Sequence, residues 1–190
     1  LVDRMIRTPG DGFTTVCFCL DDEIGTLGQK LSEDGITVRG LGRRPGIDAR
    51  LIFRLARLCR RHRVRILHCH QYSPWFYGIL ASILVPGLKV VFTEHGRFHP
   101  DLPSPKRRLF NRFLGPITHA ITAVSPAVRD ALIQVEGFRP KQVDVVMNGA
   151  SFDPPSENRE ESRAKRGVPV DALLFLMCAH FDPIKWMEGA

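Results

Sequence analysis

The feature of this sequence that most constrains its fold is the alternation of short apolar runs with longer amphipathic segments. Runs typical of β-strands are found at 14–20, 36–42, 65–70, 89–94, 118–125 and 142–148. Helical patterns are found near 23–33, 47–62, 74–84, 104–114 and 126–136. Strands separated by helices of about ten or more residues indicate βαβ crossovers, which place successive strands in parallel. The sequence therefore predicts an α/β fold with a mainly parallel sheet and helices on both faces.

Residues 150–170 interrupt this alternation with prolines, charges and small polar residues, a composition typical of a linker that carries one short helix. A further buried strand is expected at 172–181. We therefore predict a domain over 1–149, a linker over 150–170 and the start of a second domain over 171–190. We expect the fold to be incomplete at both ends. The first residues resemble the end of one helix, and the last residues resemble the start of another.

Composition narrows the class of protein. Apolar residues make up 44% of the chain and charged residues 25%, as in a typical soluble globular protein. No apolar run approaches the roughly 20 residues that a membrane-spanning helix needs, and no secretion signal is visible. The five cysteines form no C-x-x-C pair, which favours reduced thiols and a cytoplasmic location.

The net charge of +7 is concentrated in one segment. Residues 39–65 contain ten arginines and only one acidic residue, Asp48. Helical spacing places an apolar stripe opposite a cationic face. That face is made of Arg50, Arg54, Arg57 and Arg61. It is either a solvated surface or a contact for an anionic membrane or an acidic partner. Nucleic acid is not expected, because the segment carries no known nucleic-acid-binding motif.

Polar residues close four of the predicted strands. They are His70, His95, Ser125 and Asn148. Ligands bind beyond the carboxyl ends of the strands in open parallel sheets, so together these residues predict a site. Ser125 has a second interpretation, since a serine followed by Pro126 is typical of a helix N-cap. Asn148 with Gly149 is equally typical of a simple turn.

The histidines also permit a metal site. Alternate residues of a strand face the same side, so His68 and His70 could share an ion, as in metal-dependent hydrolases. A catalytic zinc site needs further ligands, and the only nearby carboxylates are Glu94 and Asp101. Glu94 should face away from His95. We therefore predict no metal and retain the hydrolase as an alternative.

The ordered motifs resemble the N-terminal domain of the family 4 retaining glycosyltransferases. The resemblance rests on "GLGRRPGIDARLIFRLARLCRRHRVRILHCHQYSPWFYGILAS", "VVFTEHGRFHPDLPSPKRRLFNRFL", "ITAVSPAVRDALIQVEGF" and "VVMNGASFD". It implies the GT-B architecture, in which two Rossmann-like domains face each other across a cleft. It also implies transfer of a sugar from a nucleotide-sugar donor to a glycan or lipid-linked acceptor, with no cofactor. The domain over 1–149 would then hold the acceptor, and 171–190 would begin the donor-binding domain.

The resemblance also implies roles for single residues. His95 matches the histidine of the family's "HG" motif beside the reacting centre, and Lys185 matches the basic residue whose positive charge neutralises the departing diphosphate. The implied substrate contacts are His70, Gln71, Tyr72, Gly96, Arg97, Asn148, Gly149 and His180. His180 departs from the family, which usually has an arginine there, and an imidazole binds phosphate less well than a guanidinium. A non-catalytic binding module of the same fold is therefore a second alternative.

Overall fold

The computed structural model describes residues 2–96, 103–149 and 156–175. The chain divides into two compact units, residues 1–148 and 149–190. The described residues of the first unit form six strands, which are β1 (Val16–Cys19), β2 (Thr37–Gly40), β3 (Ile66–His70), β4 (Lys89–Glu94), β5 (Ala120–Ala123) and β6 (Val143–Val145). Its helices are α1 (Val2–Arg7), α2 (Gly25–Glu33), α3 (Ala49–Arg61), α4 (Tyr72–Ile83), α5 (Pro105–Leu114) and α6 (Pro126–Gln134).

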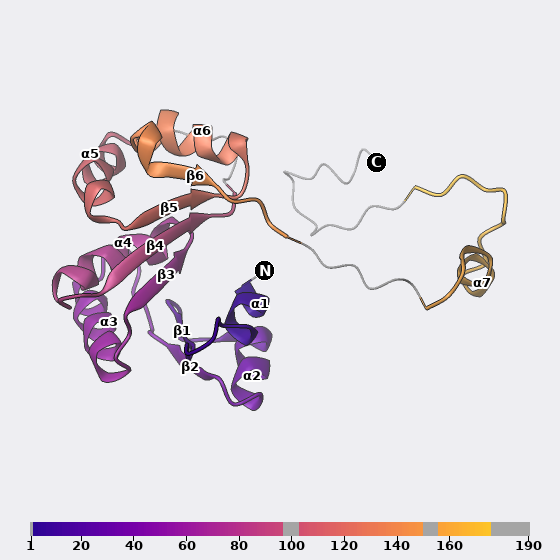
Figure 1. Ribbon diagram of the computed structural model, residues 1–190, viewed down its shortest axis with the longest axis horizontal. Helices are drawn as coiled ribbons and strands as arrows, with labels where there is room; N and C mark the ends of the chain where they lie inside the picture. Colours follow the sequence, from indigo (N-terminus) through magenta and orange to yellow (C-terminus); the bar gives the residue numbers. More distant parts are fainter. Residues whose placement is uncertain (1, 97–102, 150–155, 176–190) are drawn as a thin grey trace. The chain divides into compact units, whose positions relative to one another are not determined.

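Every strand pair in the described residues is parallel, so the predicted parallel α/β architecture is confirmed. The strands form a two-stranded sheet, β1-β2, and a four-stranded sheet in the order β3-β4-β5-β6 (Figure 1). Consecutive strands of the larger sheet are neighbours, each joined to the next through a helix. All four strands therefore end at one edge, which is where ligands bind in sheets of this kind.

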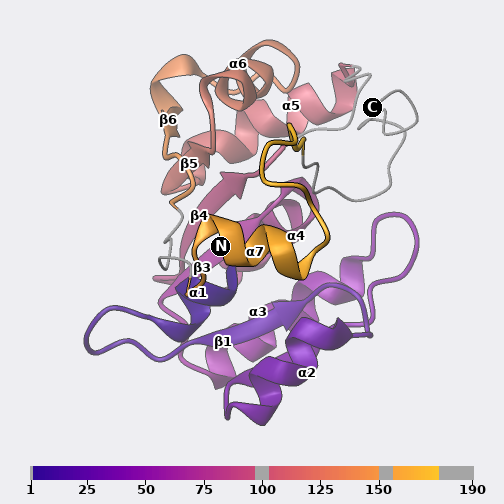
Figure 2. The ribbon, with the colours of Figure 1, turned by 90° about the vertical axis from the view of Figure 1, so that its right-hand side faces the viewer.

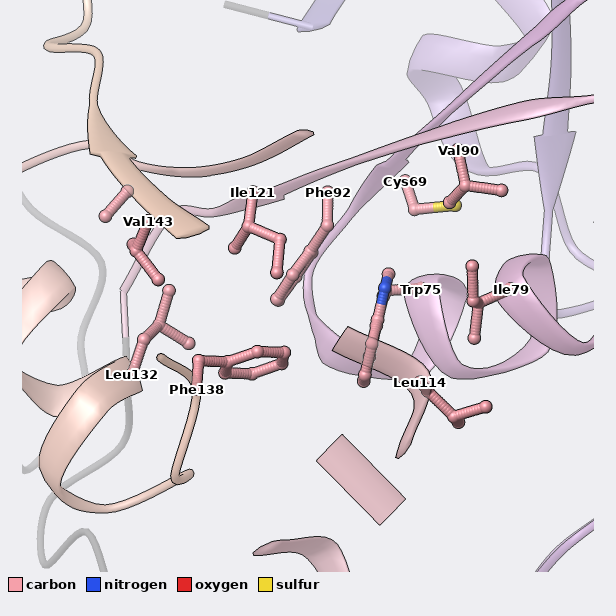
Figure 3. Packing of buried hydrophobic residues seen from close by; sticks show 11 residues of the cluster. Cys69, Trp75, Ile79, Val90, Phe92, Leu114, Ile121, Leu132, Phe138 and Val143 are labelled. Carbon is pink, nitrogen blue, oxygen red and sulfur yellow. The ribbon is translucent and has the colours of Figure 1, made fainter. Parts of the chain in front are cut away.

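The core of the larger sheet lies on the face that α4, α5 and α6 cover. Figure 3 shows Trp75 of α4 beside Phe92 of β4 and Phe138, with ring centroids 5.2 Å apart in each of these two pairs. The indole nitrogen of Trp75 donates to Thr118 Oγ1 at 3.0 Å, which satisfies its one polar atom. Since strand side chains alternate, the opposite face of β3 carries the two histidines, which are only half-buried.

Helix α3 matches the predicted arginine-rich helix. Asp48 caps it by accepting hydrogen bonds from the backbone nitrogens of Arg50 (3.1 Å) and Leu51 (3.3 Å). Leu51, Leu55, Ala56 and Cys59 are buried in a second core cluster, where α3 packs against α4. The four arginines of the predicted cationic face are exposed, and the guanidinium of Arg54 donates to the carbonyl of Leu41.

Several observed boundaries differ from the predicted ones. Helix α4 begins at Tyr72 rather than at residue 74, because the chain turns sharply at Gln71. Strand β6 ends at Val145, so Asn148 lies three residues beyond it. Two short 3₁₀ helices, Gly115–Ile117 and Pro140–Gln142, lead into β5 and β6 and were not expected.

The second unit contains α7 (Arg159–Lys165), the short helix expected within 150–170. Asn158 and Glu161 cap it reciprocally: the Asn158 side chain accepts from Glu161 N at 2.9 Å, and Glu161 accepts from Asn158 N at 3.4 Å. Of the strand expected at 172–181, residues 172–175 have no regular structure, and the rest lies outside the described residues. The boundaries of a second domain stay a prediction.

Candidate functional site

Two of the predicted site residues meet at the carboxyl edge of the larger sheet. Residue 70 ends β3, and residue 95 follows β4, an inner strand of that sheet (Figure 1). The Nδ1 atom of His70 lies 2.8 Å from the Nε2 atom of His95, a hydrogen bond whose donor depends on the tautomers. The rings are 5.0 Å apart between centroids and tilted by 34°. The sequence predicted both residues at this edge, and the structure joins them directly.

A third histidine extends this cluster along the same face of β3. The ring of His68 lies 4.2 Å from that of His70, and its Nε2 atom is 2.7 Å from the hydroxyl of Thr93. Thr93 in turn shares a hydrogen bond with Thr122 at 2.7 Å. Polar side chains thus continue from β3 across β4 to β5. We call His68, His70 and His95 the histidine cluster.

The pKa values of all three histidines in the cluster are lowered, which favours their neutral form. Burial lowers the pKa of His68, and the neighbouring His95 lowers it further. Burial and the imidazoles of His68 and His95 lower the pKa of His70 to about 4. Burial is also the main cause of the lowered pKa of His95. Neutral imidazoles donate and accept hydrogen bonds, so the cluster suits hydroxyl groups better than it suits phosphate.

The backbone next to the cluster is strained. Gln71 has φ 77° and ψ 163°, a region that residues other than glycine rarely adopt. Its nitrogen donates to Thr93 O at 2.9 Å, which holds the turn against β4. The Gln71 side chain is exposed beside His70. Such strain costs about 1–3 kcal/mol and is concentrated at functional sites in proteins.

Tyr72 begins α4 and is fixed by a network that the sequence reasoning missed. Its hydroxyl donates to Asn111 Oδ1 at 2.8 Å, and Asn111 Nδ2 donates to Glu136 O (2.8 Å) and Glu136 Oε2 (2.9 Å). The buried Glu136 also pairs with Arg107 at 2.6 Å, and the Arg107 guanidinium lies 3.8 Å from the centre of the Tyr72 ring. A polar residue within the apolar pattern of 104–114 was the available signal for Asn111.

The remaining predicted residues lie apart from the cluster or cannot be placed. Ser125 caps α6 by accepting from Val128 N at 3.2 Å, which agrees with its capping interpretation. Asn148 is exposed beyond β6. A side chain added at Gly96 or at Gly149 would meet nothing within 4 Å, so their backbones are open to approach. Arg97, His180 and Lys185 lie outside the described residues.

The described residues contain no group of three or more histidine, cysteine or acidic side chains that is placed to hold a metal ion. Glu94 is buried on the core side of β4, where its carboxylate accepts from Gly96 N at 3.5 Å. It therefore faces away from His95, as the sequence predicted. His70 Nδ1 faces His95 Nε2, and His68 Nε2 faces the hydroxyl of Thr93. Each of these rings has a second nitrogen, which can donate or accept a further hydrogen bond.

The chain is an α/β protein with a candidate ligand site at the carboxyl ends of its parallel strands. The family model for Glycosyltransferase Family 4 matches residues 8–153, more than half of the chain. The chain therefore belongs to Glycosyltransferase Family 4. A search of curated proteins found no match.

Several solved structures share the fold. A glycosyltransferase from Rickettsia africae ESF-5 is 21% identical with a TM-score of 0.63. The match covers 77% of the present chain and 40% of the Rickettsia chain. Anabaena Alr3699/HepE in complex with UDP is 20% identical with a TM-score of 0.56. This match covers 77% of the present chain and 41% of the Alr3699/HepE chain. The same protein with UDP and glucose gives a TM-score of 0.54. The chain thus spans about 40% of the length of these structures, and the similarity shows the fold alone.

Proposed function

We propose that this chain supplies the acceptor-side domain of a retaining glycosyltransferase. The enzyme would transfer a sugar from a nucleotide-sugar donor to a glycan or lipid-linked acceptor. The observation that carries this proposal is the hydrogen-bonded pair of His70 and His95 at the carboxyl edge of the sheet, within a chain of Glycosyltransferase Family 4. A neutral pair of this kind orients sugar hydroxyls through hydrogen bonds and leaves the phosphates to other groups.

We assign distinct tasks to the residues of the site. His95 would hold the donor sugar in the reacting geometry, and Gly96 would let it approach the backbone. His70, Gln71 and Tyr72 would contact the acceptor. Asn148, Gly149, Arg97 and His180 would complete the substrate contacts, and Lys185 would stabilise the negative charge that develops on the departing diphosphate. A fixed cation at such a position is often the largest single contribution to catalysis.

The cationic face of α3 would keep the enzyme near the cytoplasmic side of an anionic membrane. The face presents four exposed arginines, and charges of this kind near a membrane surface each contribute about 1 kcal/mol. Among the described residues, no helix is both long enough and apolar enough to cross a membrane. Contact through α3 would therefore be peripheral.

A transfer assay tests the proposed function. UDP-glucose is the first donor to try, since Alr3699/HepE was solved with UDP-glucose. The full-length protein, incubated with UDP-glucose and a panel of glycan and lipid acceptors, should release UDP and form a product that keeps the donor's anomeric configuration by NMR. An inverted product would contradict the retaining mechanism. Donor binding without transfer to any acceptor would favour the non-catalytic binding module.

A further inference from the structure

A cavity lies beside Tyr72, between α4 and α5. It encloses about 350 Å³ and is lined by the 43–47 loop, the first turns of α4 and the start of α5. This volume is within the range of small-ligand pockets, about 300–1,000 Å³. The lining residues are Arg43, Gly46, Ile47, Tyr72, Ser73, Phe76, Tyr77, Ser104, Lys106, Arg107 and Phe110. We call this cavity the α4–α5 pocket.

The charge of the α4–α5 pocket has one sign. Arg43, Lys106 and Arg107 line it, and none of the described lining residues is acidic. Arg107 is paired with Glu136, whereas Arg43 lies 4.0 Å from Asp21 at the protein surface, a loose contact. The positive charges of Arg43 and Lys106 thus lie close to the solvent-filled space, where a phosphate group is a matching partner.

The floor of the pocket is aromatic. Phe76 and Phe110 pack edge to face with their ring centroids 5.9 Å apart, and Phe110 is 45% exposed. Ile47 adds a further apolar surface that is 72% exposed. A free phosphate would leave this surface in water, while an apolar chain attached to the phosphate would cover it. At roughly 25 cal/mol per Å² of covered apolar surface, the chain adds affinity.

The walls of the pocket are fixed before any ligand arrives. The Tyr77 hydroxyl donates to Gly46 O at 3.1 Å and accepts from Asp48 N at 3.0 Å, which ties the 43–47 loop to α4. The bond from Tyr72 to Asn111 ties the start of α4 to α5. A pocket whose walls are held in place loses less conformational entropy on binding.

A larger hollow of about 510 Å³ on the outer side of α5 is less suited to a ligand. Its lining includes two arginines, Arg108 and Arg112. Arg108 already donates to Gln134 O at 2.5 Å and to Val135 O at 3.2 Å, so it is used to close the end of α6. No aromatic side chain is among its lining residues in the described part of the chain.

We propose that the α4–α5 pocket binds the acceptor and that this acceptor is a phosphate-bearing amphiphile. Its phosphate would lie between Arg43 and Lys106, and its apolar chain would lie on Phe76 and Phe110. Tyr72 links this pocket to the histidine cluster along the chain, since His70 ends β3 and Tyr72, two residues later, begins α4. The assignment as an acceptor site rests on the proposed function. The binding chemistry of the pocket does not.

Calorimetric titration of the full-length protein tests this proposal. The probe is dihexanoyl phosphatidic acid below its micelle-forming concentration, compared with glycerol 3-phosphate and inorganic phosphate. The amphiphile should bind saturably and more tightly than either water-soluble phosphate. The double variant Arg43→Gln/Lys106→Gln should weaken its binding by about tenfold or more, since the loss of even one charge-assisted hydrogen bond has an effect of this size. Phe110→Ser should remove the advantage of the amphiphile over glycerol 3-phosphate.

Matched variants keep the test specific. Arg139→Gln/Lys141→Gln also removes one arginine and one lysine, but at an exposed site outside the pocket lining. Phe113→Ser removes an aromatic residue of α5 that is 67% exposed. Both control variants should bind the amphiphile as the wild type does.

Equal weakening by the two double variants, or equal affinity for all three phosphates, would overturn the proposal. Amphiphile binding without any sugar transfer would contradict the proposed function alone. Transfer to a phosphate-free acceptor, undisturbed by the amphiphile, would contradict this inference alone.

Discussion

Burial, and then the imidazoles of His68 and His95, favour the neutral form of His70. The cost of burying a cation and the repulsion between neighbouring imidazolium charges both oppose its protonation. Its partner His95 completes a hydrogen bond that needs only one proton between the two facing nitrogens. The same burial that prepares these side chains to hold a sugar also makes the folded state sensitive to acid.

We expect the protein to lose stability as the pH falls from about 6.5 to about 4. In this window the unfolded chain protonates His70 near the ordinary pKa of 6.5, while the folded chain keeps it neutral down to about 4. The unfolded state therefore binds more protons, and the free energy of unfolding decreases with acidification. Urea denaturation at pH 7 and pH 5 measures the loss. His70→Gln should reduce it, and an unchanged pH dependence in this variant would contradict the assignment.

Gln71 offers a test of strain that separates stability from activity. Glycine adopts φ 77° without penalty, whereas alanine keeps the strain. Gln71→Gly should therefore be more stable than Gln71→Ala by about 1 kcal/mol. Both variants lack the carboxamide, so both should bind acceptor less well in the full-length enzyme. Equal urea midpoints for the two variants would show that the turn is not strained.

Helix α4 connects the core to both proposed sites. Its Trp75 and Ile79 are fully buried, while Tyr72 in its first turn lines the α4–α5 pocket and follows His70 by two residues. Close packing on β3 sets the position of the helix. Gly78 makes this possible, because a Cβ atom there would lie 2.6 Å from Cys69 Sγ and 3.1 Å from Leu67 Cδ2.

Gly78→Ala should lower the free energy of unfolding by about 1–3 kcal/mol, the usual cost of overpacking a core. Urea denaturation provides the measurement. Cys69→Ala removes the atom nearest to the new methyl group, so the double variant should recover part of the loss. Strictly additive effects of the two substitutions would contradict a direct contact between α4 and β3 at this point.

The cationic face of α3 gives a prediction for membrane binding. Changing Arg50, Arg54, Arg57 and Arg61 to Gln should weaken binding to vesicles that contain phosphatidylserine and leave thermal unfolding nearly unchanged. Binding of the unmodified protein should also weaken as salt rises, since exposed charges are screened over about 8 Å at physiological ionic strength. Vesicles of phosphatidylcholine alone are the control. Equal binding of variant and wild type would indicate that the cationic face of α3 is a solvated surface without a membrane contact.

The sequence predicted the parallel architecture because apolar periodicity and strand ends are local signals. It placed His70 and His95 at one edge because parallel strands all end on the same side. It could not predict the hydrogen bond between them, which depends on the register of His70 opposite Thr93. It also could not predict the network around Asn111, because no local pattern reveals such contacts. Tyr72 and Asn111 are 39 residues apart in the sequence, and Asn111 and Glu136 are 25 residues apart.

The break between the two sheets was also beyond the reach of local patterns. Each strand was visible as an apolar run, yet the partition into β1-β2 and β3-β4-β5-β6 depends on which edges meet in space. The strained turn at Gln71 was hidden for a different reason. Non-glycine residues rarely adopt that conformation, so sequence rules place the start of α4 later, at Pro74.

The kinetics of His95→Ala in the full-length protein test the central claim most directly. His119→Ala is the matched control, since His119 precedes β5 at the opposite edge of the sheet. If His95 holds the donor sugar in the reacting geometry, kcat and kcat/KM should fall together by about 100-fold while nucleotide binding stays nearly unchanged. His119→Ala should keep wild-type turnover. A His95→Ala enzyme with wild-type kcat and kcat/KM would contradict the account.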